Sequence, residues 1–148
     1  MEIYKYKNED IAASPEDIFR FVNDDKALKS IFSILKDVEY HTKGRRVKGS
    51  KFRITLGVRN KTYRFRNEIV EAVKDRSITM KTKLKQGVIT TVFNVTPVGE
   101  HSKLTVQSSI ESGMGVRVFV MTTKPLVKVI MNKEMNKFIE EVEEYSTS

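Results

Sequence analysis

The sequence predicts an α+β fold in which a curved antiparallel sheet packs on a long C-terminal helix. Three observations point to it: a short helix signal near the N-terminus, alternating strands from about residue 36 to 112, and an amphipathic helical segment that closes the chain. A sheet curved around one helix usually leaves an apolar hollow between the two layers. The order of the elements therefore indicates a place for a small guest molecule.

Residues 2–11 predict the first strand, and a short helix follows from a strong start signal within 11–22. Ser14 fits the N-cap, Pro15 the first helical position, and two acidic residues the first turn. A second short helix is expected to begin from Asp24 and to cover about 24–30. These two helices precede nearly all of the sheet.

Alternation shows which side of each later strand faces the core. Apolar and polar residues alternate in 51–58, 62–69, 77–84, 88–96 and 103–111, with turns expected at 59–61, 85–87 and 97–102. Successive hairpins of this kind make an antiparallel meander with one solvated face. The expected inward positions are Phe52, Ile54, Leu56, Val58, Tyr63, Phe65, Asn67, Ile69, Ile78, Met80, Thr82, Leu84, Ile89, Thr91, Phe93, Val95, Leu104, Val106, Ser108 and Ile110.

The last element, 125–145, carries apolar residues on one half of a helical wheel and would span roughly 30 Å. Residues 116–123 either extend this helix backwards, with Pro125 as a kink, or form a separate strand end, because periodicity cannot decide eight residues. We expect the kinked helix, lying across the sheet.

Composition narrows the class of protein. The chain has 148 residues and no cysteine, so we expect one domain, 1–148, with its own core. A disulfide framework, a thiolate zinc site and a cysteine nucleophile are excluded, and a reducing compartment is favoured. A charged N-terminus and the lack of an apolar run of about 18 residues predict neither a signal peptide nor a membrane span. We therefore expect a soluble, cytoplasmic protein.

Besides the terminal helix, three stretches of the chain are similar to segments of a known superfamily: ASPEDIF at 13–19, VKGSKF at 47–52 and NVTPVGEHSKLTV at 94–106. In these segments the chain resembles the START/Bet v 1-like (SRPBCC) superfamily, and within it the bacterial polyketide cyclase/dehydrase and lipid-transport branch. The resemblance covers almost the whole chain and implies a helix-grip fold whose cavity takes a lipid-like or polyketide-like ligand. The chain departs from many relatives in having Ile31 or Phe32 where they have Trp, and His101 and Ser102 where they have Gly-Thr.

The inward side chains are the expected lining of this cavity. A few polar groups among them would fix the orientation of a ligand, or would bond to one another and to the backbone. The methionines would suit a pliable pocket, although methionine also fills ordinary cores. The full set of expected cavity residues is Phe52, Ile54, Tyr63, Phe65, Asn67, Met80, Thr82, Thr91, Phe93, Val106, Ser108, Met121, Met131, Glu134, Met135 and Phe138.

Candidate catalytic and metal-binding groups are few. His41 and His101 are about sixty residues apart with no hydrolase or zinc-protease motif, so we interpret both as solvated and expect no metal and no cofactor. Gly113 and Gly115 lack the rest of a phosphate loop and are interpreted as a junction at the cavity mouth. Glu134 lies at the edge of the apolar stripe. It is a buried acid, a ligand for a cationic small molecule or, as we expect, an exposed residue paired with Lys137.

Positive charge is concentrated on one part of the chain. The net charge is +8, and residues 43–85 hold fifteen Lys or Arg against three acidic residues. A basic face should therefore project from the outer side of the sheet, where it would contact nucleic acid, a ribosome or anionic lipid, or would only keep the sheet solvated. No aromatic residues interleave with it as a stacking platform. Its expected members are Lys51, Arg53, Arg64, Arg66, Lys81 and Lys83.

Three functions follow as hypotheses. The first is binding of a small hydrophobic ligand, as a carrier or sensor. The second is a cyclase or dehydratase, in which Tyr63, Asn67 or Glu134 would act on a carbonyl; no titratable pair at the cavity is evident for acid/base work. The third is an interaction protein that uses the basic face. The sequence does not decide the oligomeric state, and it favours the first hypothesis over the enzyme.

Overall fold

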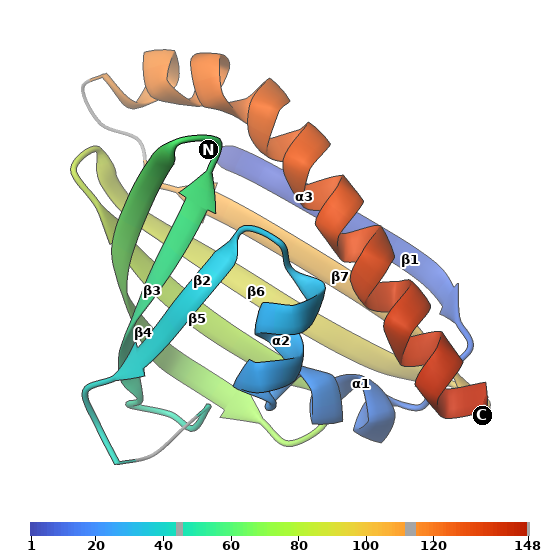
Figure 1. The fold of residues 1–148 in the computed structure, drawn as a ribbon. Coiled ribbons are helices and arrows are strands. Elements are labelled where there is room, and N and C mark those ends of the chain that lie inside the picture. The colour runs from blue at the N-terminus through green and yellow to red at the C-terminus, as the bar shows by residue number, and fades with distance from the viewer. Residues whose placement is uncertain (44–45, 112–114, 148) are drawn as a thin grey trace.

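The computed structural model describes residues 1–43, 46–111 and 115–147. Seven strands form one sheet, entirely antiparallel, in the order β1-β7-β6-β5-β4-β3-β2. With a long C-terminal helix and two short ones, this is the predicted α+β helix-grip arrangement (Figure 1). The elements are β1 Glu2–Ile11, α1 Pro15–Val22, α2 Asp25–Ile31, β2 Leu35–Tyr40, β3 Lys51–Val58, β4 Lys61–Val73, β5 Ser77–Leu84, β6 Gly87–Val98, β7 His101–Ile110 and α3 Val116–Thr147.

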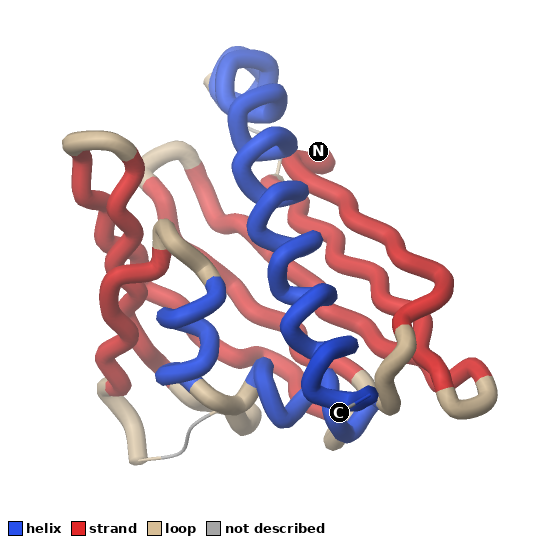
Figure 2. The backbone as a smooth tube through the Cα atoms, turned by 45° about the vertical axis from the view of Figure 1, so that its right-hand side comes forward, coloured by secondary structure: helices blue, strands red, loops and turns tan. Residues whose placement is uncertain are grey.

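The helices cover one face of the sheet unevenly. Helix α3 lies over the sheet on the side of β1, while α1 and α2 close one end of the space beneath it (Figures 1 and 2). The β3–β4 hairpin lies toward the opposite edge of the sheet. The expectation that the long helix would lie across the whole sheet is therefore only partly met, because α1 and α2 occupy part of that face.

Both short helices begin where the sequence predicts. The Ser14 side chain accepts a hydrogen bond from the Asp17 backbone N–H at 3.2 Å, and Asp24 accepts one from Ala27 at 3.1 Å. Each cap satisfies a donor that has no partner inside the helix. The two helices turn Ile18, Phe19 and Leu28 into the core.

Helix α3 is continuous through Pro125, so the alternative of a separate strand end at 116–123 is excluded. Its N-terminal turns, orange in Figure 1, run at an angle to the remainder. Pro125 has no N–H for the carbonyl of Met121 and its ring crowds the preceding turn. The hydroxyls of Thr122 and Thr123 donate to the Phe119 carbonyl at 3.0 and 2.7 Å, a contact that also favours bending.

One predicted turn is wrong. The expected loop 97–102 is strand for most of its length, since β6 continues to Val98 and β7 begins at His101. The turn is only Gly99 and Glu100, and Gly99 has a φ of +61°, a conformation that glycine adopts without a steric penalty. Pro97 and Gly99 are residue types common in turns, so the sequence favours a wider turn than the structure has.

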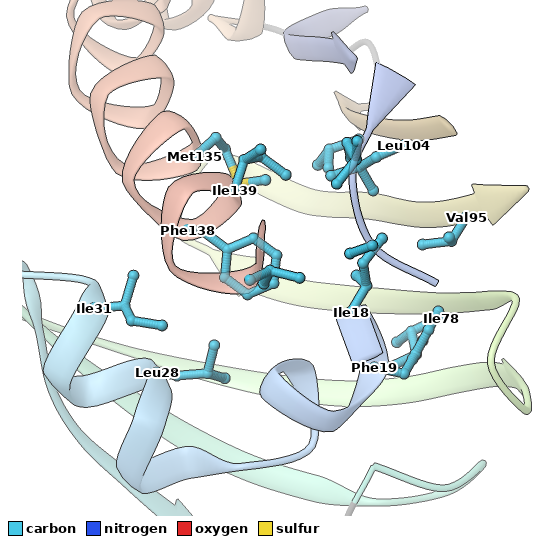
Figure 3. Close-up of a cluster of buried hydrophobic side chains, with 14 of the residues drawn as sticks. Ile18, Phe19, Leu28, Ile31, Ile78, Val95, Leu104, Met135, Phe138 and Ile139 are labelled. Atoms are coloured by element: carbon cyan, nitrogen blue, oxygen red, sulfur yellow. The ribbon is translucent and has the colours of Figure 1, made fainter. Parts of the chain in front are cut away.

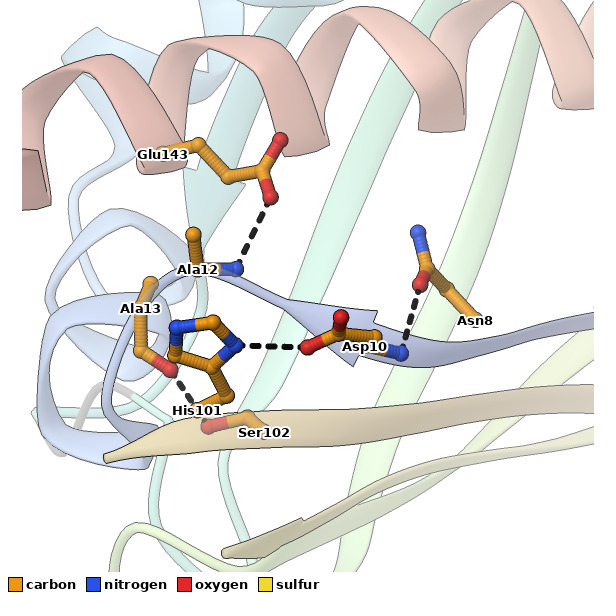
Figure 4. Close-up of polar contacts among 7 residues, drawn as sticks. All are labelled: Asn8, Asp10, Ala12, Ala13, His101, Ser102 and Glu143. Carbon is orange, nitrogen blue, oxygen red and sulfur yellow. Dashed lines mark hydrogen bonds and ion pairs between the residues drawn. The ribbon is translucent and has the colours of Figure 1, made fainter. Parts of the chain in front are cut away.

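The corner after β1 is tied to both neighbouring layers (Figure 4). The Ala12 N–H donates to the Glu143 carboxylate of α3 at 2.8 Å, and the hydroxyl of the fully buried Ser102 donates to the Ala13 carbonyl at 2.7 Å. His101 Nδ1 lies 2.6 Å from the Asp10 carboxylate on the surface. The start of α1 is therefore held by α3 and β7 together.

The main core lies between α1, α2, α3 and the middle of the sheet (Figure 3). Phe138 is 1 % exposed and stands against Phe32, Phe21 and Phe93, with ring centroids 5.8, 6.5 and 6.5 Å away. A second cluster joins the first turns of α3 to the sheet edge through Val116, Val120, Ile3 and Ile110.

Candidate ligand cavity

An apolar cavity of about 240 Å³ lies within the main core. Helices α1 and α2 and the segment after α2 contribute Val22, Leu28 and Phe32 to its lining, and α3 contributes Met135 and Phe138. The sheet supplies Ile69, Ile78, Met80, Thr91, Phe93 and Val106. These strands present alternate residues to the helices, so the cavity floor is made by one face of β4 to β7.

Arg46 is the charged residue that lines this cavity. Its side chain is only 14 % exposed; one guanidinium nitrogen lies 2.6 Å from the Asp25 carboxylate, and the guanidinium carbon lies 5.4 Å from the centroid of the Phe52 ring. Its Nε is buried and has no hydrogen-bond partner within the described residues. A buried donor without a partner costs free energy unless a ligand or water satisfies it.

The inward polar side chains mostly satisfy one another, as one of the two alternatives anticipated. Thr82 donates to the Asn67 side-chain oxygen at 2.6 Å, and the Asn67 amide donates to the Phe65 carbonyl at 3.0 Å. The hydroxyls of Thr91 and Ser108 share a hydrogen bond of 2.7 Å. One of those two hydroxyls keeps a proton that it can donate elsewhere, and Thr91 lines the cavity.

The structure brings six of the expected cavity residues to this lining: Met80, Thr91, Phe93, Val106, Met135 and Phe138. Phe52, Asn67 and Thr82 are buried but do not line this cavity, while Ile54, Phe65, Ser108 and Met131 are half-buried on the inner side. Two expected residues are exposed instead, and a third is buried in a contact of its own.

Met121 is 69 % exposed, so its placement in the cavity is wrong. The core-facing residues of this part of α3 are Val116 and Val120, and Met121 follows Val120 by about 100° around the helix. The run VRVFVM is apolar on several sides, which is why periodicity did not assign its inner face.

Tyr63 lies on the inner side of β4 but is 42 % exposed, so it does not enclose a ligand in this cavity. It sits in the β3–β4 hairpin opposite Leu56, and its ring is stacked with that of Phe65 at a centroid distance of 6.4 Å. Alternation of polar and apolar residues predicts the correct side of the strand, but it does not predict how much of that side the helices cover.

Glu134 is 4 % exposed, so the expected exposed pair with Lys137 is wrong. Its carboxylate accepts hydrogen bonds from the Ser33 hydroxyl at 2.6 Å and the Ser33 N–H at 3.2 Å, and so joins α3 to the segment after α2. It is not among the residues that line the cavity.

Six lining residues are absent from the expected cavity set: Val22, Leu28, Phe32, Arg46, Ile69 and Ile78. Ile69 and Ile78 are correctly expected to face inward, but not as cavity residues. Val22, Leu28 and Phe32 belong to α1, to α2 and to the segment after it, whose position over the sheet is set by tertiary packing. Arg46 lies in an irregular segment of a strongly basic stretch, where no periodicity marks one arginine as buried. Of the expected junction glycines, Gly113 lies outside the described residues, and Gly115 precedes α3 with a φ of +84°.

Within the described residues, no three His, Asp or Glu side chains come together as a metal-binding group. No helix in that part of the chain is both long enough and apolar enough to cross a membrane.

The fold and the apolar cavity define a START/Bet v 1-like protein of the helix-grip class. A family model described as polyketide cyclase / dehydrase and lipid transport matches residues 6–143, so the chain belongs to that family. Comparison with curated proteins finds no significant match.

Solved structures agree on the fold. The di-domain ARO/CYC StfQ from the steffimycin biosynthetic pathway matches with a TM-score of 0.74 at 9 % identity, over 99 % of this chain and 52 % of StfQ. Protein NE0264 from Nitrosomonas europaea gives 0.73 at 12 % identity, over 98 % and 96 % of the two chains. TTHA0849 from Thermus thermophilus gives 0.69 at 17 % identity, over 97 % and 95 %.

Proposed function

We propose that this protein binds a small hydrophobic ligand in the cavity between the sheet and its three helices, as a carrier or sensor. The observation that carries the proposal is an apolar cavity of about 240 Å³ that is lined in part by Arg46, whose buried Nε has no partner within the described residues. Pockets that bury a drug-sized ligand usually measure about 300–1,000 Å³. The ligand should therefore be small and apolar, with one hydrogen-bond acceptor for Arg46.

The cytoplasmic location expected from the sequence is part of this proposal, since a chain without cysteine makes no use of an oxidising compartment. The membership of the polyketide cyclase/dehydrase and lipid transport family supports the class of ligand without naming it.

The test uses three probes that share one ring system: naphthalene, 2-acetonaphthone and 2-naphthoate. Binding is measured by ligand-observed NMR and by the shift in thermal midpoint. Wild-type protein should bind all three, and the two probes with an acceptor should bind more tightly. Arg46→Met should remove that difference and leave naphthalene binding in place, because the apolar lining is unchanged.

A filling substitution separates cavity binding from surface binding. Val106→Phe places a larger side chain in the lining and should weaken all three probes. Val92→Phe makes the same change on the outer face of β6, where Val92 is 38 % exposed, and should leave binding unaltered. If no probe binds the wild type, or if both variants behave alike, the cavity is not a ligand site.

A cyclase or dehydratase is the second candidate, supported by the family description and by the same Arg46 donor, which could polarise a substrate carbonyl. Arg46 is the one ionisable side chain in the described lining, so the cavity offers no evident general base. Conversion of a diketo-acyl thioester, followed by mass spectrometry, tests this activity. Turnover by wild type that Arg46→Met abolishes would favour the enzyme over the carrier.

A further inference from the structure

A second and larger hollow, of about 750 Å³, opens on the other side of the sheet. Its charged lining comes mainly from outward-facing positions of β3, β4 and β5. The other lining residues are His41, Val88, Glu111 and two residues that are buried on the inner side, Phe52 and Asn67. Five of its lining side chains are Lys or Arg and two are Glu. It lies outside the apolar cavity and shares no lining residue with it.

Strand register brings like charges directly opposite one another in this hollow. Arg53 on β3 pairs with Arg66 on β4, and Arg66 pairs in turn with Lys83 on β5. Directly opposed like charges in a sheet are destabilising. A row of three cations across three neighbouring strands therefore costs stability, which an anion bound over the row would recover.

The available carboxylates neutralise only part of this charge. Arg53 lies 2.6 Å from Glu39, and Lys51 lies 3.7 Å from Glu68. Arg66, Lys81 and Lys83 have no carboxylate partner within the described residues. Three cations without an ion pair in that part of the chain thus remain on β4 and β5. Lys81 faces Glu68 across the β4–β5 pair, whereas Arg66 and Lys83 face no acidic residue on either neighbouring strand.

We propose that this outer hollow is a binding site for a small anion that carries a di- or triphosphate group. Three unpartnered cations match the charge of such a group, and the planar guanidinium of Arg66 suits bidentate contact with phosphate oxygens. Glu68 and Glu111 also line the hollow, so its positive charge is not an uninterrupted track, and the site fits a small molecule better than a polymer.

Two other partners fit less well. Single-stranded nucleic acid is held by stacking on aromatic side chains, and Tyr63 and Phe65 lie on the inner side of β4. A lipid bilayer is flat and is contacted by projecting cations, whereas these cations surround a concavity. Both remain measurable outcomes of the same experiment.

Tripolyphosphate is the first probe, titrated by calorimetry at constant ionic strength into the full chain. Wild type should bind it and should unfold at a higher temperature in its presence. The double variant Arg66→Gln, Lys83→Gln should bind about tenfold more weakly or worse, because it loses two of the three unpartnered cations. The control, Lys124→Gln with Lys128→Gln, removes the same charge from exposed positions of α3 and should retain affinity within about twofold.

A second signature needs no ligand. Without any polyanion, Arg66→Gln, Lys83→Gln should be at least as resistant to urea as wild type, since the opposed charges are removed. The proposal is overturned if tripolyphosphate does not bind, or if the control pair weakens binding as much as the site pair. It is equally overturned if phosphatidylglycerol vesicles or single-stranded RNA bind while tripolyphosphate does not.

Discussion

Single residues in this protein have roles that their sequence neighbours do not reveal. The residues next to Glu134 in the sequence are typical of a surface helix, yet its carboxylate is buried against Ser33. Arg46 belongs to a basic stretch, yet it is 14 % exposed and lines an apolar cavity. In both cases the decisive partner comes from a segment far away in the chain or from a different element.

Glu134→Gln should lower the free energy of unfolding by about 1–3 kcal/mol. Both Ser33 groups donate to the carboxylate, and one of them would instead face the NH₂ group of the glutamine, which is also a donor. Urea denaturation measures the change. Glu140→Gln, an exposed acid on the same helix, should change stability by no more than about 0.5 kcal/mol. If the two variants lower the free energy of unfolding equally, the buried contact of Glu134 with Ser33 does not stabilise the protein.

Tyr4 gives a prediction for alkaline pH. Burial, with a smaller contribution from Tyr6, raises the pKa of Tyr4 from its ordinary value of 10.0 to about 12. Its hydroxyl donates to the Asn132 side chain at 2.8 Å, which requires the protonated form. The folded state therefore holds this proton more tightly than the unfolded state, and the resulting stability is present below pH 10 and lost as pH rises toward 12.

Tyrosinate absorbance measured against pH should show one tyrosine that ionises later than the others, and Tyr4→Phe should abolish that late step. The variant should also lose less stability than wild type over the same alkaline interval. A wild-type titration without a late step would contradict the prediction.

At the scale of elements, local sequence signals predict the boundary of a helix or strand correctly where residues at that boundary set it. The start of α1 is such a case, since Ser14 and Pro15 set the cap and the first turn without help from the rest of the chain. The predicted β6–β7 turn is too wide, because Pro97 is a residue type common in turns and here lies within β6. The path of 116–123 needed the structure, which shows helix on both sides of Pro125.

Ser14→Ala should destabilise the protein by about 0.5–2 kcal/mol, because the Asp17 N–H loses its side-chain acceptor. The thermal midpoint and urea denaturation both report this loss. Ser14→Asp restores a good N-cap and should return most of the stability. A Ser14→Asp protein as weak as Ser14→Ala would mean that the hydroxyl acts elsewhere than at the cap.

At the scale of the whole molecule, the two faces of the sheet have different chemistry. The inner face and the three helices enclose an apolar cavity, while the outer face carries opposed cations around a larger hollow. Phe138 is central to the inner side, because its ring contacts residues of α1, of β6 and of the segment after α2.

Phe138→Ala should cost about 3–5 kcal/mol of unfolding free energy and should enlarge the cavity. An apolar cavity of greater volume should bind naphthalene more tightly, provided the variant is studied at a temperature where it remains folded. Leu126→Ala, a truncation at a position of α3 that is 54 % exposed, should change neither stability nor binding by much. Loss of naphthalene binding in folded Phe138→Ala would contradict the cavity model.

The sequence by itself determined the fold class, the inward side of strands β3 to β7 and the starts of the short helices, because these depend on periodicity and capping within a few residues. Tertiary structure alone decided which inward residues enclose the cavity, since α1, α2 and α3 cover the sheet unevenly. It excluded Tyr63 and Met121 and brought in Arg46. Likewise, the sequence predicted a basic face, but only strand register aligned Arg53, Arg66 and Lys83 in one row.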